Sequence, residues 1–70
     1  MITRDALAAA LLDVGRTVTD EDAALFSKID PAAADAPFAA TILIRARFGR
    51  PIPPPQVHRV MDALREARSQ

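Results

Sequence analysis

The fold is decided by residues 36–48, which read Ala-Pro-Phe-Ala-Ala-Thr-Ile-Leu-Ile-Arg-Ala-Arg-Phe. This is the most apolar stretch of the chain, and it predicts a central helix that is apolar on two sides. Ile44 and Phe48 would form one ridge, and a broader face nearly opposite would hold Phe38, Ala39, Ile42, Leu43 and Ala46. A helix with two apolar sides must be enclosed by its own chain or bury one side against another molecule.

The composition of the remaining chain also favours helices. Half of the 70 residues are hydrophobic, fifteen of them are alanine, and tryptophan and tyrosine are absent. Alanine favours helix, and the two glycines, Gly15 and Gly49, stand where helices would be expected to stop. The sequence therefore predicts one all-α domain over residues 1–70, a compact bundle of about four short helices around the central one.

Capping residues mark two helices that precede the central one. Thr3 is a natural N-cap for a helix over residues 4–14. Thr19 and Asp22 have the spacing of a capping box, which predicts a second helix that ends near Asp30.

Prolines shape the connections. Asp30 followed by Pro31 predicts one short helical turn over residues 30–34. Residues 50–55 are proline-rich and predict a stiff, extended connection. The last helix is expected over residues 56–68, with a narrow apolar stripe of Val57, Val60, Met61, Leu64 and Ala67.

The charges are unevenly distributed along a chain whose net charge is zero. Residues 1–40 carry seven acidic and three basic residues, whereas residues 41–70 carry six arginines and two acidic residues. The two halves are expected to complement each other within the fold or across a dimer. The alternative is an arginine-rich surface for an acidic partner.

The sequence disfavours catalysis and metal binding. The chain has no cysteine, so it has neither a disulfide framework nor a thiolate metal site. The acids of residues 19–22 suit helix capping, and no EF-hand spacing follows them. His58, the only histidine, has no cysteine or signature hydroxyl to activate. We therefore expect no enzymatic activity, no cofactor and no metal.

The sequence also carries signals of location and origin. No stretch approaches the roughly 18 apolar residues of a membrane-spanning helix, and no basic segment followed by an apolar run opens the chain. We expect a cytoplasmic protein that does not bind membranes. Eight of the nine basic residues are arginine, and alanine and proline are abundant, which indicates a GC-rich genome of a bacterium or phage.

The leading functional hypothesis is a small non-enzymatic protein-binding module, an inhibitor or adaptor of a larger bacterial or phage complex. An apolar ridge flanked by arginines has the composition that is enriched at the centres of interfaces. The expected partner-binding residues are Ile44, Arg45, Arg47, Phe48 and Arg50. Self-association through the same ridge is the close alternative, and it would make the protein a homodimer or a purely structural homo-oligomeric assembly factor.

Nucleic-acid binding of a weak or architectural kind is a further alternative. It would use six arginines of the C-terminal half: Arg45, Arg47, Arg50, Arg59, Arg65 and Arg68. The proline-rich connection is too long for the tight turn of a helix-turn-helix, and the net charge is zero rather than strongly basic. These features favour a protein partner over a nucleic acid.

Overall fold

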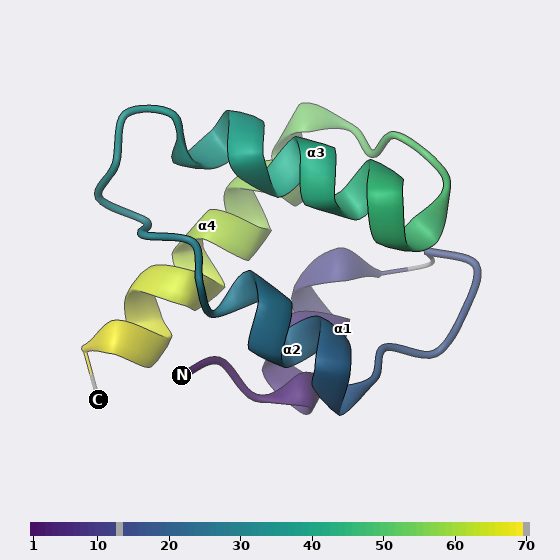
Figure 1. The fold of residues 1–70 in the computed structure, drawn as a ribbon, viewed down its shortest axis with the longest axis horizontal. Helices are drawn as coiled ribbons and strands as arrows, with labels where there is room; N and C mark the ends of the chain where they lie inside the picture. The colour runs from purple at the N-terminus through teal and green to yellow at the C-terminus, as the bar shows by residue number, and fades with distance from the viewer. Residues whose placement is uncertain (13, 70) are drawn as a thin grey trace.

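A computed structural model describes residues 1–12 and 14–69, and within them the chain forms four helices and no strand. The helices are α1 (Arg4–Leu11), α2 (Asp20–Phe26), α3 (Ala36–Phe48) and α4 (Pro54–Arg68). Helix α4 packs against both α1 and α3, and α2 contacts these same two helices. In the view of Figure 1, α3 lies across the top, with α1 and α2 below it. The predicted all-α bundle is confirmed.

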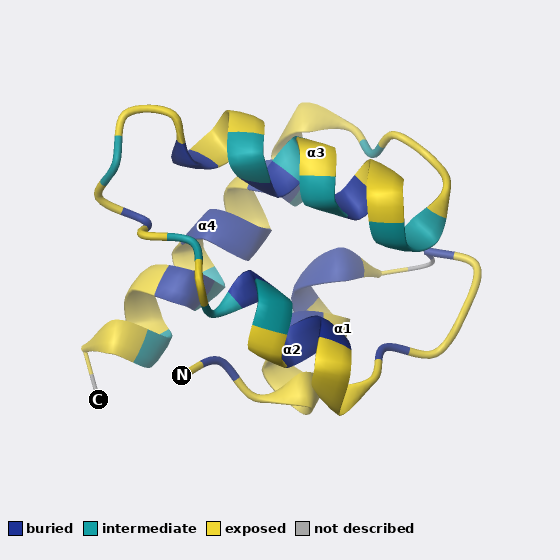
Figure 2. Ribbon diagram, in the orientation of Figure 1, coloured by how far each residue is buried: buried dark blue, intermediate teal, exposed yellow. Residues whose placement is uncertain are grey.

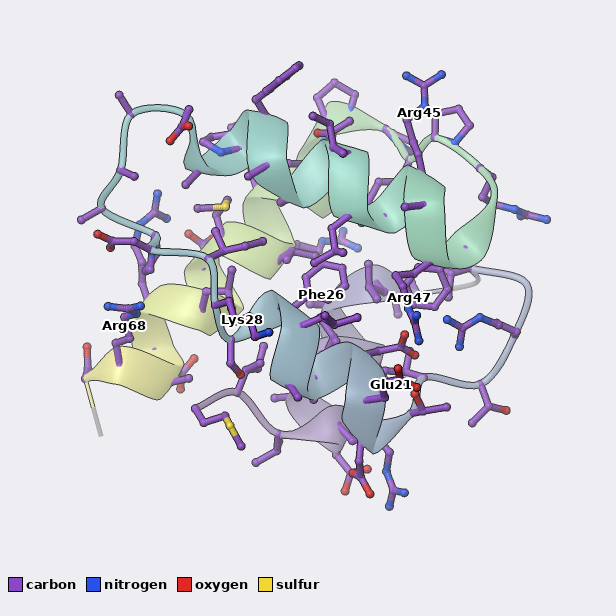
Figure 3. All side chains as sticks on the ribbon, in the orientation of Figure 1. Glu21, Phe26, Lys28, Arg45, Arg47 and Arg68 are labelled. Atoms are coloured by element: carbon purple, nitrogen blue, oxygen red, sulfur yellow. The ribbon has the colours of Figure 1, made fainter. Side chains whose placement is uncertain are left out.

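The core lies between the four helices and is built from medium-sized side chains. Phe26 of α2 is fully buried and points into the space between the helices (Figure 3). Residues outside the helices also reach the core, notably Ile2, Val14 and Val18. The other large side chains that are fully enclosed are Leu7, Leu11, Ile44, Val60 and Met61.

The predicted caps position the helix ends. The Thr3 hydroxyl accepts a hydrogen bond from the Ala6 amide at 3.1 Å and begins α1. Thr19 and Asp22 form the capping box of α2, because each side chain accepts a hydrogen bond from the main-chain amide of the other. Gly49 ends α3 with a φ of 74°, a left-handed conformation that glycine adopts without steric cost. Helix α3 has the predicted bounds.

Helix α1 is shorter than predicted. It ends at Leu11, because Leu12 has a φ of 41° and leaves the helical path. Val14, the predicted last residue of this helix, is nevertheless buried and reaches the core from the loop. Asp13, which the predicted helix included, lies outside the described residues.

Two other boundaries also differ from the prediction. Helix α2 ends at Phe26 rather than near Asp30. Residues 30–34 are not assigned as helix, but one turn begins at Asp30, whose carbonyl accepts a hydrogen bond from the Ala33 amide at 3.0 Å. Helix α4 begins at Pro54, so the extended connection is shorter than residues 50–55. Proline is tolerated at the first positions of a helix because the amides there have no helical acceptor.

Candidate protein interface on helix α3

The face of α3 that packs inward carries the smaller side chains. Ala36, Ala40 and Ile44 are spaced four residues apart, and each is at most 1% exposed. The two alanines let α3 lie close to the core, and Ile44 fills the space at the next turn. The prediction that Ile44 forms an outward ridge is therefore wrong, because close packing buries the alanine face of the helix.

The opposite face of α3 leaves two large apolar side chains uncovered. Phe38 is 68% exposed and Ile42 is 50% exposed. They are four residues apart, so they are neighbours on the helix surface. Figure 2 shows exposed residues alternating with buried ones along α3. The helix thus has more apolar surface than its own chain covers, and we call Phe38 and Ile42 the α3 patch.

A groove of about 270 Å³ lies beside the α3 patch, between α3 and the start of α4. Its polar groups include the Thr41 hydroxyl and the His58 imidazole. The Thr41 hydroxyl already donates a hydrogen bond to the Pro37 carbonyl at 2.9 Å. The groove therefore offers a partner mainly apolar surface. Its lining residues are Pro37, Phe38, Thr41, Ile52, Pro54, Val57 and His58.

Arg47, one of the predicted partner-binding residues, is engaged inside the fold. It is half-buried, and its Nε donates to Asp22 at 2.9 Å. Its Nη2 lies 3.5 Å from the Glu21 carboxylate. Figure 3 shows Arg47 pointing toward Glu21, whereas Arg45 points away from the protein. Arg47 therefore belongs to the internal packing of α2 against α3, contrary to its predicted place on an outward surface.

Phe48 is also held by its own chain. It is half-buried against the core, and the Arg16 guanidinium lies over its ring at 4.2 Å from the centroid. An arginine over an aromatic face is attracted by the ring quadrupole. Of the five residues predicted to bind a partner, Arg45 and Arg50 are therefore the ones that are exposed.

Asp22 is a fully buried carboxylate to which two arginines are bound. Its oxygens accept hydrogen bonds from Arg16 Nη1 and Nη2 and from Arg47 Nε, each at 2.9 Å. They also accept bonds from the Thr19 amide at 2.9 Å and the Thr19 hydroxyl at 3.0 Å. The Arg16 hydrogen bonds hold the pKa of Asp22 well below its usual range, although burial opposes them. The buried charge is thus fully compensated.

Arg16 is the structural residue that sequence reasoning missed. It lies between α1 and α2, and its Nε and Nη2 donate to the Arg47 carbonyl at 3.2 and 3.0 Å. Carbonyls in the last turn of a helix lack helical partners, so Arg16 caps the C-terminal end of α3. Its side chain ties a loop to α2 and α3 at once. No local pattern signals this contact, because 31 positions separate the two residues.

The arginines proposed to bind nucleic acid are partly neutralised within the fold. Arg65 pairs with Asp62 at 2.8 Å, and Arg68 pairs with Asp30 at 3.8 Å. The pairs made by Arg47 and Arg68 confirm the expected match between the basic and acidic halves. Among residues 1–12 and 14–69, no ion pair is formed by Arg45, Arg50 or Arg59.

A second groove, of about 470 Å³, lies between α1 and α4. Five of its ten lining residues are alanines, four are polar or charged, and Met1 is its single large apolar side chain. It offers less surface for an apolar anchor than the α3 patch does. Its alanines are Ala6, Ala9, Ala10, Ala63 and Ala67.

Within the described part of the chain, no group of three histidine or acidic residues is placed to hold a metal ion. None of the helices there has the length and apolarity needed to cross a bilayer. Comparison with protein families, characterised proteins and solved structures finds no match to this chain. Its function is therefore inferred from the chemistry of its surface.

Proposed function

We propose that this protein is a non-enzymatic module that binds another protein molecule, of its own or of a different kind, through the α3 patch. The observation that carries the proposal is the exposure of Phe38 and Ile42 on adjacent turns of α3, beside an apolar groove. A large aromatic anchor within a small apolar cluster is typical of the residues that dominate binding energy at interfaces. Arg45, exposed on the same side of the helix, supplies a charge for the polar rim.

Burial of the α3 patch would be favourable. Full burial of a large apolar side chain stabilises by about 1.5–3 kcal/mol relative to the exposed state. Scaled by the exposed fractions of Phe38 and Ile42, 68% and 50%, the two residues together would contribute about 2–3.5 kcal/mol. The isolated fold does not gain this free energy, because both side chains stay exposed, and it is released only when a partner buries them.

A nucleic-acid partner has less support. Arg47, Arg65 and Arg68 are paired with acids of the same chain. Binding to phosphates depends on clustered positive charge. The unpaired arginines within the described residues belong to α3, to the connection after it and to α4. Apolar surface, rather than positive charge, distinguishes the outer side of α3.

Site-specific photo-crosslinking in cells of the native host, where a natural partner is present, tests the proposal. A benzoyl-phenylalanine at position 38 keeps an aromatic ring in the α3 patch, and it should form a covalent protein adduct on irradiation. The added substitution Ile42→Ser should reduce that adduct, because it removes the second apolar anchor. The control places the same crosslinker at Ala24, an exposed residue of α2. No adduct from position 38, or the same adducts from position 24, would refute a protein-binding role for this surface.

A further inference from the structure

We infer that the partner on the α3 patch is a second copy of this chain, bound through α3 in an antiparallel orientation. The inference rests on the proposed function, because it names the occupant of the same surface. It is drawn from the positions of four residues on the outer side of α3, two apolar and two charged.

These four residues are symmetric about one position in the helix. Phe38 and Ile42 lie two positions to either side of Ala40, and Asp35 and Arg45 lie five positions to either side. At 100° per residue the four fall within an arc of about 80°. A twofold axis on the outer side of α3, level with Ala40, therefore places Phe38 of one copy against Ile42 of the other. The same axis places Asp35 of one copy against Arg45 of the other.

Both charged residues are uncommitted in the described part of the monomer. Asp35 stands at the N-cap of α3, but its side chain makes no capping hydrogen bond. Neither Asp35 nor Arg45 forms an ion pair within residues 1–12 and 14–69. They are about 15 Å apart along the helix, too far to pair with each other in one molecule. In the antiparallel dimer each meets the opposite charge of the other copy.

The opposite orientation is disfavoured by the same residues. A parallel pair of α3 helices would bring Asp35 against Asp35 and Arg45 against Arg45, and like charges across an interface are repulsive. It would also align the two helix dipoles. The charge pattern therefore selects the antiparallel, self-complementary arrangement of a twofold dimer.

Small side chains beside the patch allow the two helices to approach. Two alanines border the patch: Ala39, which is half-buried, and Ala46, which is exposed. The spacing of three, four and three from Asp35 to Arg45 is that of a helix-pairing seam. One helix from each copy buries less than the roughly 1,200 Å² of a stable specific interface. We therefore expect a weak dimer, with a Kd on the order of 10–100 µM.

Sedimentation equilibrium between about 10 µM and about 1 mM protein tests the inference. The mass should rise with concentration from 7.5 kDa toward twice that value, and Phe38→Ser should abolish the rise. Asp35→Arg and Arg45→Asp should each raise Kd about tenfold, because two repulsive contacts replace two attractive ones. The double exchange should restore the original Kd, because it restores both pairs with their signs reversed. Arg59→Asp, an equal charge change on α4, should leave Kd unchanged.

Several outcomes would overturn the inference. A monomer at every concentration excludes the dimer, and a crosslink from position 38 to a different protein would then leave the proposed function standing. A dimer that survives Phe38→Ser uses another surface, and failure of the double exchange to restore Kd refutes the antiparallel register. Circular dichroism checks that each variant is folded. If Asp35→Arg lowers helicity, the neutral variants Asp35→Asn and Arg45→Gln replace the charge reversals. If neither neutral variant raises the Kd of the dimer, the inference is refuted as well.

Discussion

Replacement of Asp22 by asparagine tests the energetic role of the buried carboxylate. In the native protein this group is fully buried and accepts hydrogen bonds from Arg16, Arg47 and Thr19. Asparagine has nearly the same shape, but it carries no charge, and its amide nitrogen cannot accept a hydrogen bond. Asp22→Asn therefore leaves two guanidinium groups facing an NH₂ group or a single neutral oxygen.

The magnitude follows from the exposure of the two arginines. Removal of one partner of a buried ion pair costs about 3–5 kcal/mol when the other charge stays buried. The side chains of Arg16 and Arg47 are 36% and 30% exposed, so both can turn toward water and reduce that cost. The remaining amide oxygen can keep part of the capping box. We expect a loss of about 2–3 kcal/mol, or about 10–20 °C in Tm.

Urea unfolding followed by circular dichroism at 222 nm measures this loss. The control is Glu21→Gln, which removes the same charge from the adjacent residue. The Glu21 side chain is 74% exposed and lies 3.5 Å from Arg47, so its loss should cost less than about 1 kcal/mol. If Asp22→Asn and Glu21→Gln lower the free energy of unfolding by the same amount, the hydrogen bonds of Asp22 do not stabilise the fold in the way described.

Three further predictions concern the same fold. The pKa of Asp22 is lower in the folded state than its unfolded value near 4, so the stabilisation of the fold by the ionised carboxylate is complete above about pH 5 and is lost progressively as the pH falls below about 4. The urea midpoint of the native protein should therefore drop as the pH is lowered from about 5 to below 4, and the midpoint of Asp22→Asn should drop less steeply. Ile44→Ala should lower the free energy of unfolding by about 2–4 kcal/mol through a core cavity, whereas Phe38→Ser should change it by less than about 1 kcal/mol. If urea titrations show a larger loss for Phe38→Ser than for Ile44→Ala, the wrong face of α3 has been assigned to the core. Gly49→Ala should cost about 1–2 kcal/mol in thermal unfolding, because φ at position 49 is 74° and no described atom lies close enough for a steric clash to contribute; a neutral result would mean that this turn can relax.

Most helix ends were predictable from the sequence because capping is local. Thr3 and Thr19 each accept a hydrogen bond from an amide three residues ahead, and Gly49 closes the helix that precedes it. The start of α3 follows from Pro37 in its first turn rather than from a side-chain cap, because Asp35 makes no capping hydrogen bond. The early end of α1 had no such signal, because Leu12 leaves the helix at a position with neither glycine nor proline.

The candidate interface was only partly predictable. The sequence shows that α3 is apolar on two sides, and for the same reason its periodicity does not decide which side is buried. That choice depends on how closely Ala36 and Ala40 let α3 approach the rest of the core. The sequence-based hypothesis placed the partner-binding surface on the ridge of Ile44 and Phe48, whereas the structure buries Ile44 and leaves Phe38, on the opposite face, exposed. The bonds of Arg16 likewise depend on chain segments that are distant in sequence.

The double engagement of Asp22 has a consequence for local opening of the protein. Helix α2 has seven residues, and helices of that length are not stable in isolation. The carboxylate that closes its first turn also anchors the last turn of α3 through Arg47. The amide protons of both segments should therefore exchange with solvent deuterium in one concerted event, as a single foldon, rather than by independent fraying of two helix ends.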